Sequence, residues 1–137
     1  MRRVPLPAAV AAQITAHARS QPEREVCGLV SALDTGDLQV HAVENVAAQP
    51  DVRFEMDPRQ QIHALQQMRE QGRRLFAIYH SHPRGPDTPS ALDRELAAYP
   101  EALYLIIAPD AGGVWRLHGY FLDTHGKAEA VELATAE

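Results

Sequence analysis

Residues 75–83 read Leu75-Phe76-Ala77-Ile78-Tyr79-His80-Ser81-His82-Pro83. The apolar run 75–79 predicts a buried central strand, and Pro83 limits further strand pairing. His80 and His82 lie two residues apart at the end of this strand, so both imidazoles are expected on the same side of it. Two nitrogen ligands can then converge on one metal ion.

The segments on either side alternate between helical and strand patterns. Before residue 75 the sequence predicts a helix over 7–20, a hairpin of strands 26–33 and 38–46 joined by a turn at 34–37, a short strand over 52–56, and a helix that is capped by Asp57, opens at Pro58 and stops at Gly72. After residue 83 it predicts a loop over 84–89, a helix over 90–98, and strands over 103–108, 114–122 and 128–133. We therefore expect one domain over residues 1–137, of the α/β or α+β class, with a single mixed sheet flanked by helices.

The composition excludes several classes of function. The chain has 137 residues, 45% of them hydrophobic, a formal net charge of −5 and one cysteine. At this length folding buries roughly two-thirds of the unfolded chain's surface, so disulfides are unnecessary. The acidic balance argues against nucleic-acid binding, and no stretch approaches the ~20 apolar residues of a membrane span. With no cysteine pair, the cytoplasm is the expected compartment.

The N-terminus superficially resembles a secretory signal, because Arg2-Arg3 precede an apolar segment. Prolines and polar residues interrupt that segment. Its larger apolar residues, Leu6, Val10 and Ile14, recur every four residues, which is typical of one stripe of an amphipathic helix packed on the core.

A carboxylate follows the two histidines at a suggestive spacing. Asp93 lies eleven residues beyond His82, and Ser90 precedes it by three residues on the same face of the predicted helix. Two imidazoles and one carboxylate leave the fourth tetrahedral position open, which is the composition of a catalytic zinc site. Taken alone, each part has a plainer interpretation, since His-x-His can be a polar loop and Ser-x-x-Asp a helix capping box.

The remaining candidates have structural interpretations. Cys27 lies in a predicted apolar strand and is expected to be a small core residue rather than a nucleophile. Arg84, in the loop between the histidines and Asp93, is expected either to meet a substrate carboxylate or to be a solvated arginine. The other histidines match no ligand spacing: His17, His41, His63, His118 and His125.

Together these motifs resemble the JAMM (MPN-plus) metallopeptidases, whose signature is an upstream Glu, then His-x-His-Pro, then Ser-x-x-Asp. Here the signature is His80-Ser81-His82-Pro83, six intervening residues, and Ser90-Ala91-Leu92-Asp93. The upstream Pro22-Glu23-Arg24-Glu25-Val26-Cys27-Gly28-Leu29 is similar to the family's entry to its first strand. We align the family glutamate with Glu25, with Glu23 as the rival.

The resemblance implies the JAMM/MPN fold, a mixed curved sheet between helices similar to that of cytidine deaminases. It also implies one Zn²⁺ per chain held by His80, His82 and Asp93, with Glu25 as general base and Ser90 stabilising the oxyanion. Segments such as 53–58 and 99–107 resemble the short bacterial branch. That branch includes peptidases that act after the Gly-Gly of ubiquitin-like sulfur-carrier proteins, some of which release cysteine.

The sequence also bears on several other functions. A deaminase needs a zinc-binding cysteine pair, and a helix-borne zinc protease needs His-Glu-x-x-His; the sequence has neither. The family also contains non-catalytic scaffold domains, ubiquitin-type isopeptidases and phage-tail-type peptidases. Retention of the whole signature argues against a scaffold, and the lack of long insertions between the motifs argues against a deubiquitinase. The sequence leaves open whether the chain acts alone or as a homodimer.

Overall fold

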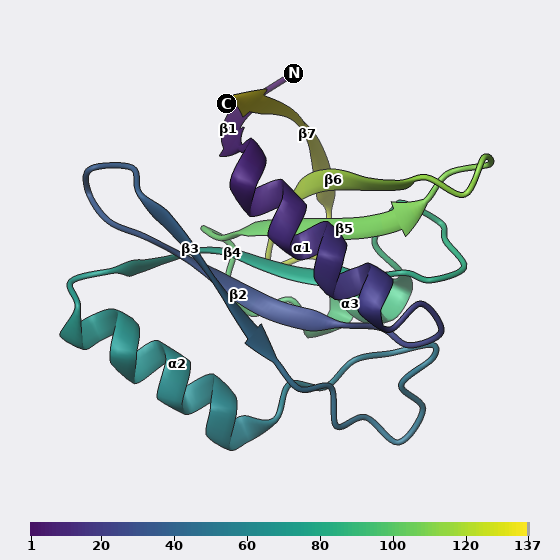
Figure 1. Ribbon diagram of the computed structural model, residues 1–137, viewed down its shortest axis with the longest axis horizontal. Coiled ribbons are helices and arrows are strands. Elements are labelled where there is room, and N and C mark those ends of the chain that lie inside the picture. The colour runs from purple at the N-terminus through teal and green to yellow at the C-terminus, as the bar shows by residue number, and fades with distance from the viewer. Residues whose placement is uncertain (137) are drawn as a thin grey trace.

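The computed structural model describes residues 1–136, which form a seven-stranded sheet in the order β1-β7-β6-β5-β4-β2-β3 (Figure 1). The elements are β1 (Arg3–Pro7), α1 (Ala8–Ser20), β2 (Cys27–Ala32), β3 (Leu38–Val43), α2 (Pro58–Glu70), β4 (Arg74–Ser81), α3 (Ala91–Leu96), β5 (Leu103–Pro109), β6 (Trp115–Leu122) and β7 (Ala128–Ala136). The pairs β4–β5 and β1–β7 are parallel, and the other neighbours are antiparallel. The predicted mixed sheet flanked by helices is confirmed.

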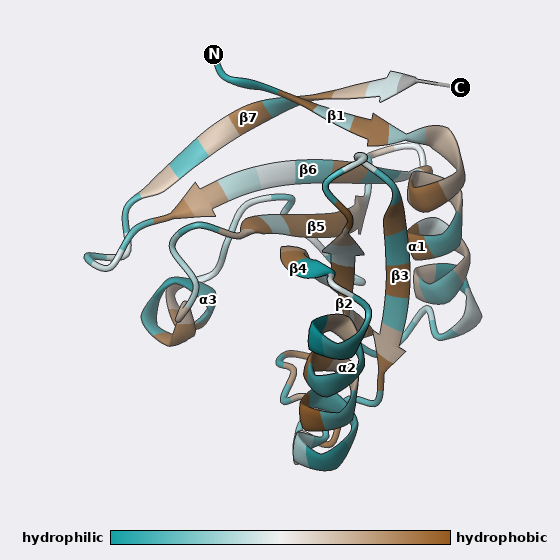
Figure 2. Cartoon of the chain, turned by 90° about the vertical axis from the view of Figure 1, so that its left-hand side faces the viewer, coloured by the Kyte–Doolittle hydropathy of each residue, from teal (hydrophilic) through white to brown (hydrophobic). Residues whose placement is uncertain are grey.

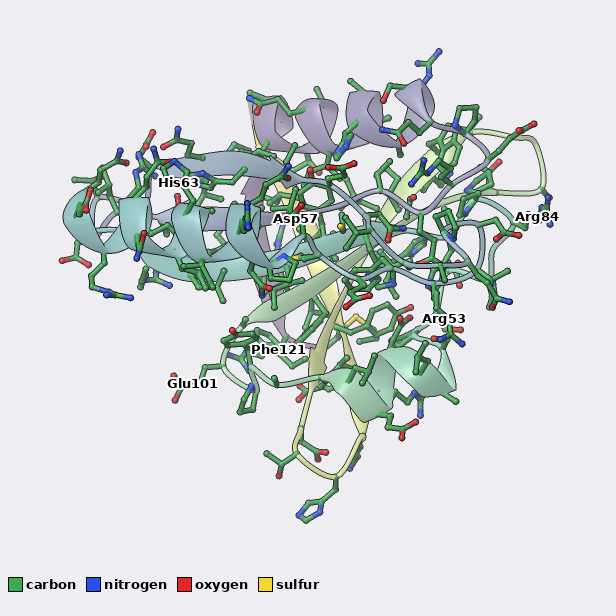
Figure 3. All side chains as sticks on the ribbon, turned by 90° about the horizontal axis from the view of Figure 1, so that it is seen from below. Arg53, Asp57, His63, Arg84, Glu101 and Phe121 are labelled. Atoms are coloured by element: carbon green, nitrogen blue, oxygen red, sulfur yellow. The ribbon has the colours of Figure 1, made fainter. Side chains whose placement is uncertain are left out.

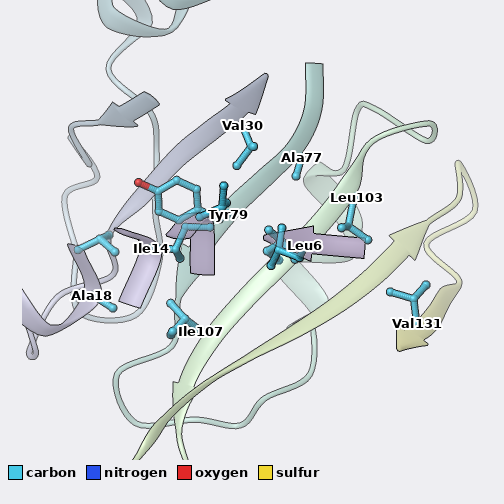
Figure 4. Packing of buried hydrophobic residues seen from close by; sticks show 12 residues of the cluster. Leu6, Ile14, Ala18, Val30, Ala77, Tyr79, Leu103, Ile107 and Val131 are labelled. Carbon is cyan, nitrogen blue, oxygen red and sulfur yellow. The ribbon is translucent and has the colours of Figure 1, made fainter. Parts of the chain in front are cut away.

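One face of the sheet is covered by α1. Val10 and Ile14 of the predicted helical stripe lie on α1, whereas Leu6 lies in β1. All three are buried in a core cluster that also contains Tyr79 of β4. Figure 4 shows side chains of this cluster spread over the strands, with Tyr79 close to Ile14. The Nδ1 atom of His17, on α1, lies 2.7 Å from the Tyr79 hydroxyl oxygen, so the buried phenol has a polar partner.

The opposite face carries α2 and α3, and it is the face on which the site lies. A second core cluster joins Met68 of α2 to Ile78 of β4 and Tyr104 of β5. In Figure 2, β5 is brown along much of its length, as expected of a strand covered on both faces. Because side chains alternate along β4, Tyr79 points to the α1 face and His80 to the α2 and α3 face.

The predicted strand over 52–56 is wrong. Within that segment only Met56 makes a β-bridge, an isolated one to Asn45. The rest is a loop whose backbone bonds instead to the Asn45 side chain. The alternation of Val52, Phe54 and Met56 therefore arises from a loop that turns two of its side chains inward.

Other boundaries also shift. β1 was missed, and residue 7, the predicted start of the first helix, belongs to this edge strand, where proline is tolerated. β3 ends at Val43 rather than at residue 46, α3 ends at Leu96, and β7 extends to Ala136. Asp57 caps α2 as predicted by accepting hydrogen bonds from the first turn. Within residues 1–136, no helix has both the length and the apolar content that crossing a bilayer requires.

Candidate metal centre

The two histidines of the motif point to the same side, as predicted. His80 lies near the end of β4 and His82 directly after it, and their Nε2 atoms are 3.0 Å apart. The N–H of His82 bonds to the Ile107 carbonyl at 2.9 Å, so the pairing with β5 continues past β4 and fixes both positions. Both side chains are buried.

Asp93 brings its carboxylate to the same point. Its Oδ2 lies 3.1 Å from His80 Nε2 and 3.0 Å from His82 Nε2. Although burial acts to raise the pKa of Asp93, the hydrogen bonds from the two imidazoles outweigh it and hold that pKa far below its usual range. For His82, burial acts to lower the pKa, but the bonds to Asp93 and to the Pro86 carbonyl raise it overall. The ionised carboxylate and the two imidazoles therefore converge on one point.

Glu25 completes the cluster from the segment just before β2. It is 5% exposed, and its carboxylate and the two imidazoles offer ligand atoms within 4.8 Å of one another. Burial raises the pKa of Glu25 to about 7. Its Oε1 is buried without a hydrogen-bond partner among the described residues, which is unusual unless the atom serves a bound group. These residues therefore fit a divalent metal with oxygen and nitrogen ligands. The rival Glu23 is exposed.

Ser81, between the two histidines, was not singled out from the sequence. Its hydroxyl accepts a 2.8 Å hydrogen bond from the Val26 N–H and donates a 3.3 Å bond to the Arg24 carbonyl. Glu25 lies between those two residues. The only signal available in the sequence was a small polar residue between the two histidines, just beyond the strand predicted to be buried.

Ser90 forms the capping box that the sequence allowed. Its hydroxyl accepts a 3.0 Å bond from the Asp93 N–H, and the Ser90 N–H donates to Asp93 Oδ2 at 2.9 Å. The cap thus fixes the carboxylate that faces the histidines. In the structure Ser90 therefore acts as the cap of α3.

A cleft of about 660 Å³ opens beside the cluster. Its lining includes the polar residues His80 and Asp93 and the apolar or aromatic residues Phe54, Leu96 and Tyr99. Arg53 also borders this cleft and is seen next to α3 in Figure 3. The mostly apolar walls can hold an extended peptide against the donor atoms.

The remaining candidates have structural roles or lie at the surface. Cys27 is fully buried, and burial raises the pKa of its thiol to about 12, which fits a core residue. Arg84 is exposed and lies at the outer edge of the molecule in Figure 3. His17 pairs with Tyr79, and His41 Nε2 lies 2.8 Å from the Ser31 hydroxyl.

Solved structures share this fold. A protein of Desulfitobacterium hafniense has a TM-score of 0.81 and 30% identity, over 97% of this chain and 92% of its own. A JAB1/MPN domain protein from Archaeoglobus fulgidus has a TM-score of 0.59 and 20% identity over the full length of both chains. The mixed sheet with its flanking helices is thus a JAB/MPN-type fold.

Sequence comparison defines the family. Residues 7–118 match the prokaryotic homologs of the JAB domain, and the chain belongs to that family. It is 39% identical over 115 residues to a desampylase of Haloferax volcanii, covering 79% of this chain and 82% of the relative. It is also 36% identical over 72 residues to a "Probable TtuB-protein conjugate cleaving protease" of Thermus thermophilus, covering 53% of this chain and 48% of the relative. The family resemblance inferred from the motifs is confirmed.

Proposed function

We propose that this chain is a zinc-dependent peptidase that hydrolyses the peptide or isopeptide bond after the C-terminal Gly-Gly of a ubiquitin-like or sulfur-carrier protein. The observation that carries the proposal is the convergence of His80, His82 and Asp93 next to the unpartnered carboxylate of Glu25. Family membership and relatives named as a desampylase and a conjugate cleaving protease support it.

In this proposal His80, His82 and Asp93 hold one Zn²⁺, which, when bound, activates a water and polarises the scissile carbonyl. Glu25 accepts the proton of the attacking water and delivers it to the leaving amine. A pKa of about 7 suits a group that must take and give a proton near neutral pH. The Ser90 hydroxyl donates to the developing oxyanion, a contribution of about 3 kcal/mol.

The cleft beside the cluster suits the tail of such a carrier. A Gly-Gly tail lacks side chains at the scissile bond and can therefore approach the buried imidazoles closely in an extended form. The leaving group is either a cysteine or a lysine-linked protein, and only a cysteine would present a free carboxylate for a residue such as Arg84 to meet. The cytoplasm remains the proposed compartment, and oligomeric state does not enter the mechanism.

The first test is metal stoichiometry by plasma mass spectrometry on tag-free protein. We expect close to one zinc per chain, lost in Asp93→Ala and kept in Glu95→Ala, a matched change of an exposed carboxylate on the same helix. Glu25→Gln should keep zinc and lose cleavage of a carrier tail. If the parent binds no metal even after reconstitution with zinc, the peptidase proposal fails and the scaffold alternative takes its place.

A further inference from the structure

The two imidazoles of the cluster are oriented by different means. His82 Nδ1 lies 2.7 Å from the Pro86 carbonyl, a hydrogen bond that leaves Nε2 free to face Asp93. His80 Nδ1 is buried and has no hydrogen-bond partner among the described residues, and the side chain is only 1% exposed. A metal-ligating histidine normally donates its second N–H to a protein acceptor, which sets its ring orientation. Something else must set the orientation of His80.

The ring of Phe54 is placed to set the orientation of the His80 imidazole. Its centroid is 4.5 Å from that of His80, with an angle of 26° between the planes, so the two rings are stacked. Rotation of the imidazole out of this plane would drive its edge into the phenyl face. Phe54 belongs to the loop between β3 and α2, so it reaches His80 from outside the strands that pair with β4.

The loop backbone on both sides of Phe54 is held by one buried amide. Asn45 Nδ2 donates to the Arg53 carbonyl at 3.0 Å, and Asn45 Oδ1 accepts from the Glu55 N–H at 3.0 Å. The same Nδ2 donates to the Glu25 carbonyl at 2.9 Å. One side chain therefore ties the stacking residue to the segment that carries the carboxylate of the cluster.

We propose that Phe54 is the positioning residue for His80, replacing the missing hydrogen bond at Nδ1, and that Asn45 acts on His80 through Phe54. The proposal rests on the proposed function, since it takes His80 as a metal ligand. Stacking holds Nε2 of His80 toward Asp93 and His82, so the site is preorganised before the metal binds.

The test compares Phe54→Leu with Phe54→Tyr, because leucine keeps an apolar wall for the cleft but loses the flat ring, whereas tyrosine keeps both. Zinc affinity is measured by competition with a chromophoric chelator, and site geometry by the visible absorption of the Co²⁺-substituted protein. We expect Phe54→Leu to bind zinc 10–100-fold more weakly, with a changed Co²⁺ spectrum, and Phe54→Tyr to match the parent in both. Val52→Ala, at an exposed site in the same loop, is the control and should match the parent.

The role of Asn45 is tested by adding Asn45→Ser to Phe54→Leu. If Asn45 acts through Phe54, the double variant loses no more zinc affinity than Phe54→Leu alone. If the losses of zinc affinity from the two changes add, Asn45 does not act through Phe54. A Phe54→Leu protein with the parent's zinc affinity and Co²⁺ spectrum overturns the positioning role, while a parent that binds no metal overturns the proposed function itself.

Discussion

The hydroxyl of Ser81 accepts a 2.8 Å hydrogen bond from the backbone N–H of Val26. Ser81 stands between the two histidines on one chain segment, and Val26 directly follows Glu25 on another. Ser81 also donates to the Arg24 carbonyl, so its hydroxyl bonds to the backbone of the residues just before and just after Glu25. The strand that supplies the imidazoles thus also places the carboxylate opposite them.

Replacing Ser81 by alanine should therefore disturb the position of Glu25, the proposed general base, more than it disturbs zinc binding. The change leaves the buried Val26 N–H without its side-chain acceptor, and we expect a loss of about 1–3 kcal/mol in the free energy of unfolding. Turnover should fall while zinc stoichiometry stays near one. Urea unfolding and metal analysis check this, with Ser20→Ala, an exposed hydroxyl on α1, as a control expected to change stability by at most about 0.5 kcal/mol. Zinc loss in Ser81→Ala would mean that the contact serves the imidazoles instead.

Substitutions at Ser90 separate capping from catalysis. Ser90→Ala removes the acceptor for the Asp93 N–H and should cost about 1 kcal/mol of stability. Ser90→Gly should cost only a few tenths of that, because glycine is tolerated at this capping position. If the hydroxyl also stabilises the oxyanion, both variants should lose turnover by about 10²–10³-fold, and Ser90→Thr should recover it. Near-parental turnover in Ser90→Gly would leave Ser90 as a cap alone.

The raised pKa of Glu25 predicts a pH-dependent stability difference. In the folded protein burial raises the pKa of Glu25 from 4.5 to about 7. The contribution of this group to the free energy of unfolding is therefore fully present below about pH 4.5 and is lost as the pH rises through about 7. Chelator-treated Glu25→Gln should therefore gain stability over the parent between pH 5 and pH 8, on the order of 2–3 kcal/mol. Urea unfolding at several pH values measures this. The exposed Glu23→Gln should show no such trend, and a pH-independent difference for Glu25→Gln would contradict the assignment.

Local patterns were enough to bring together His80, His82 and Asp93. The two-residue spacing of His80 and His82 at a strand end put both rings on one side, and the three-residue spacing of Ser90 and Asp93 put both at the start of a helix. These are properties of a single element. The choice of Glu25 over Glu23 came instead from a family resemblance, and in the structure burial separates them.

Local sequence patterns could not predict contacts between segments that lie far apart in the chain. β1 forms because its backbone pairs with β7 more than 120 residues later, and nothing within residues 3–7 indicates that partner. The alternation of Val52, Phe54 and Met56 suggested a strand, but no neighbouring strand pairs with that loop beyond the Asn45–Met56 bridge. Ser81 and Phe54, which the sequence did not indicate, contact the cluster through such tertiary contacts.

The close approach of Gly28 to Tyr79 predicts a defect that is confined to stability. A Cβ at Gly28 would lie 2.4 Å from Cε2 and 2.5 Å from Cζ of Tyr79, and that ring is fully buried and cannot move away freely. Gly28→Ala should therefore lower the free energy of unfolding by about 1–3 kcal/mol, as overpacking does. Gly112→Ala, at an open turn where the nearest atom is 3.4 Å away, is the control and should lose less in the same urea titration.

Combining Gly28→Ala with Tyr79→Leu should cost less than the sum of the two single changes, because the smaller side chain leaves room for the added methyl group. Tyr79 packs on the α1 face, whereas His80 next to it faces α2 and α3, so zinc stoichiometry should stay unchanged in all three proteins. Equal losses from Gly28→Ala and Gly112→Ala would show that the clash with Tyr79 is relieved elsewhere in the core. Metal loss in the folded Gly28→Ala protein would show that the two faces of β4 are coupled through the strand.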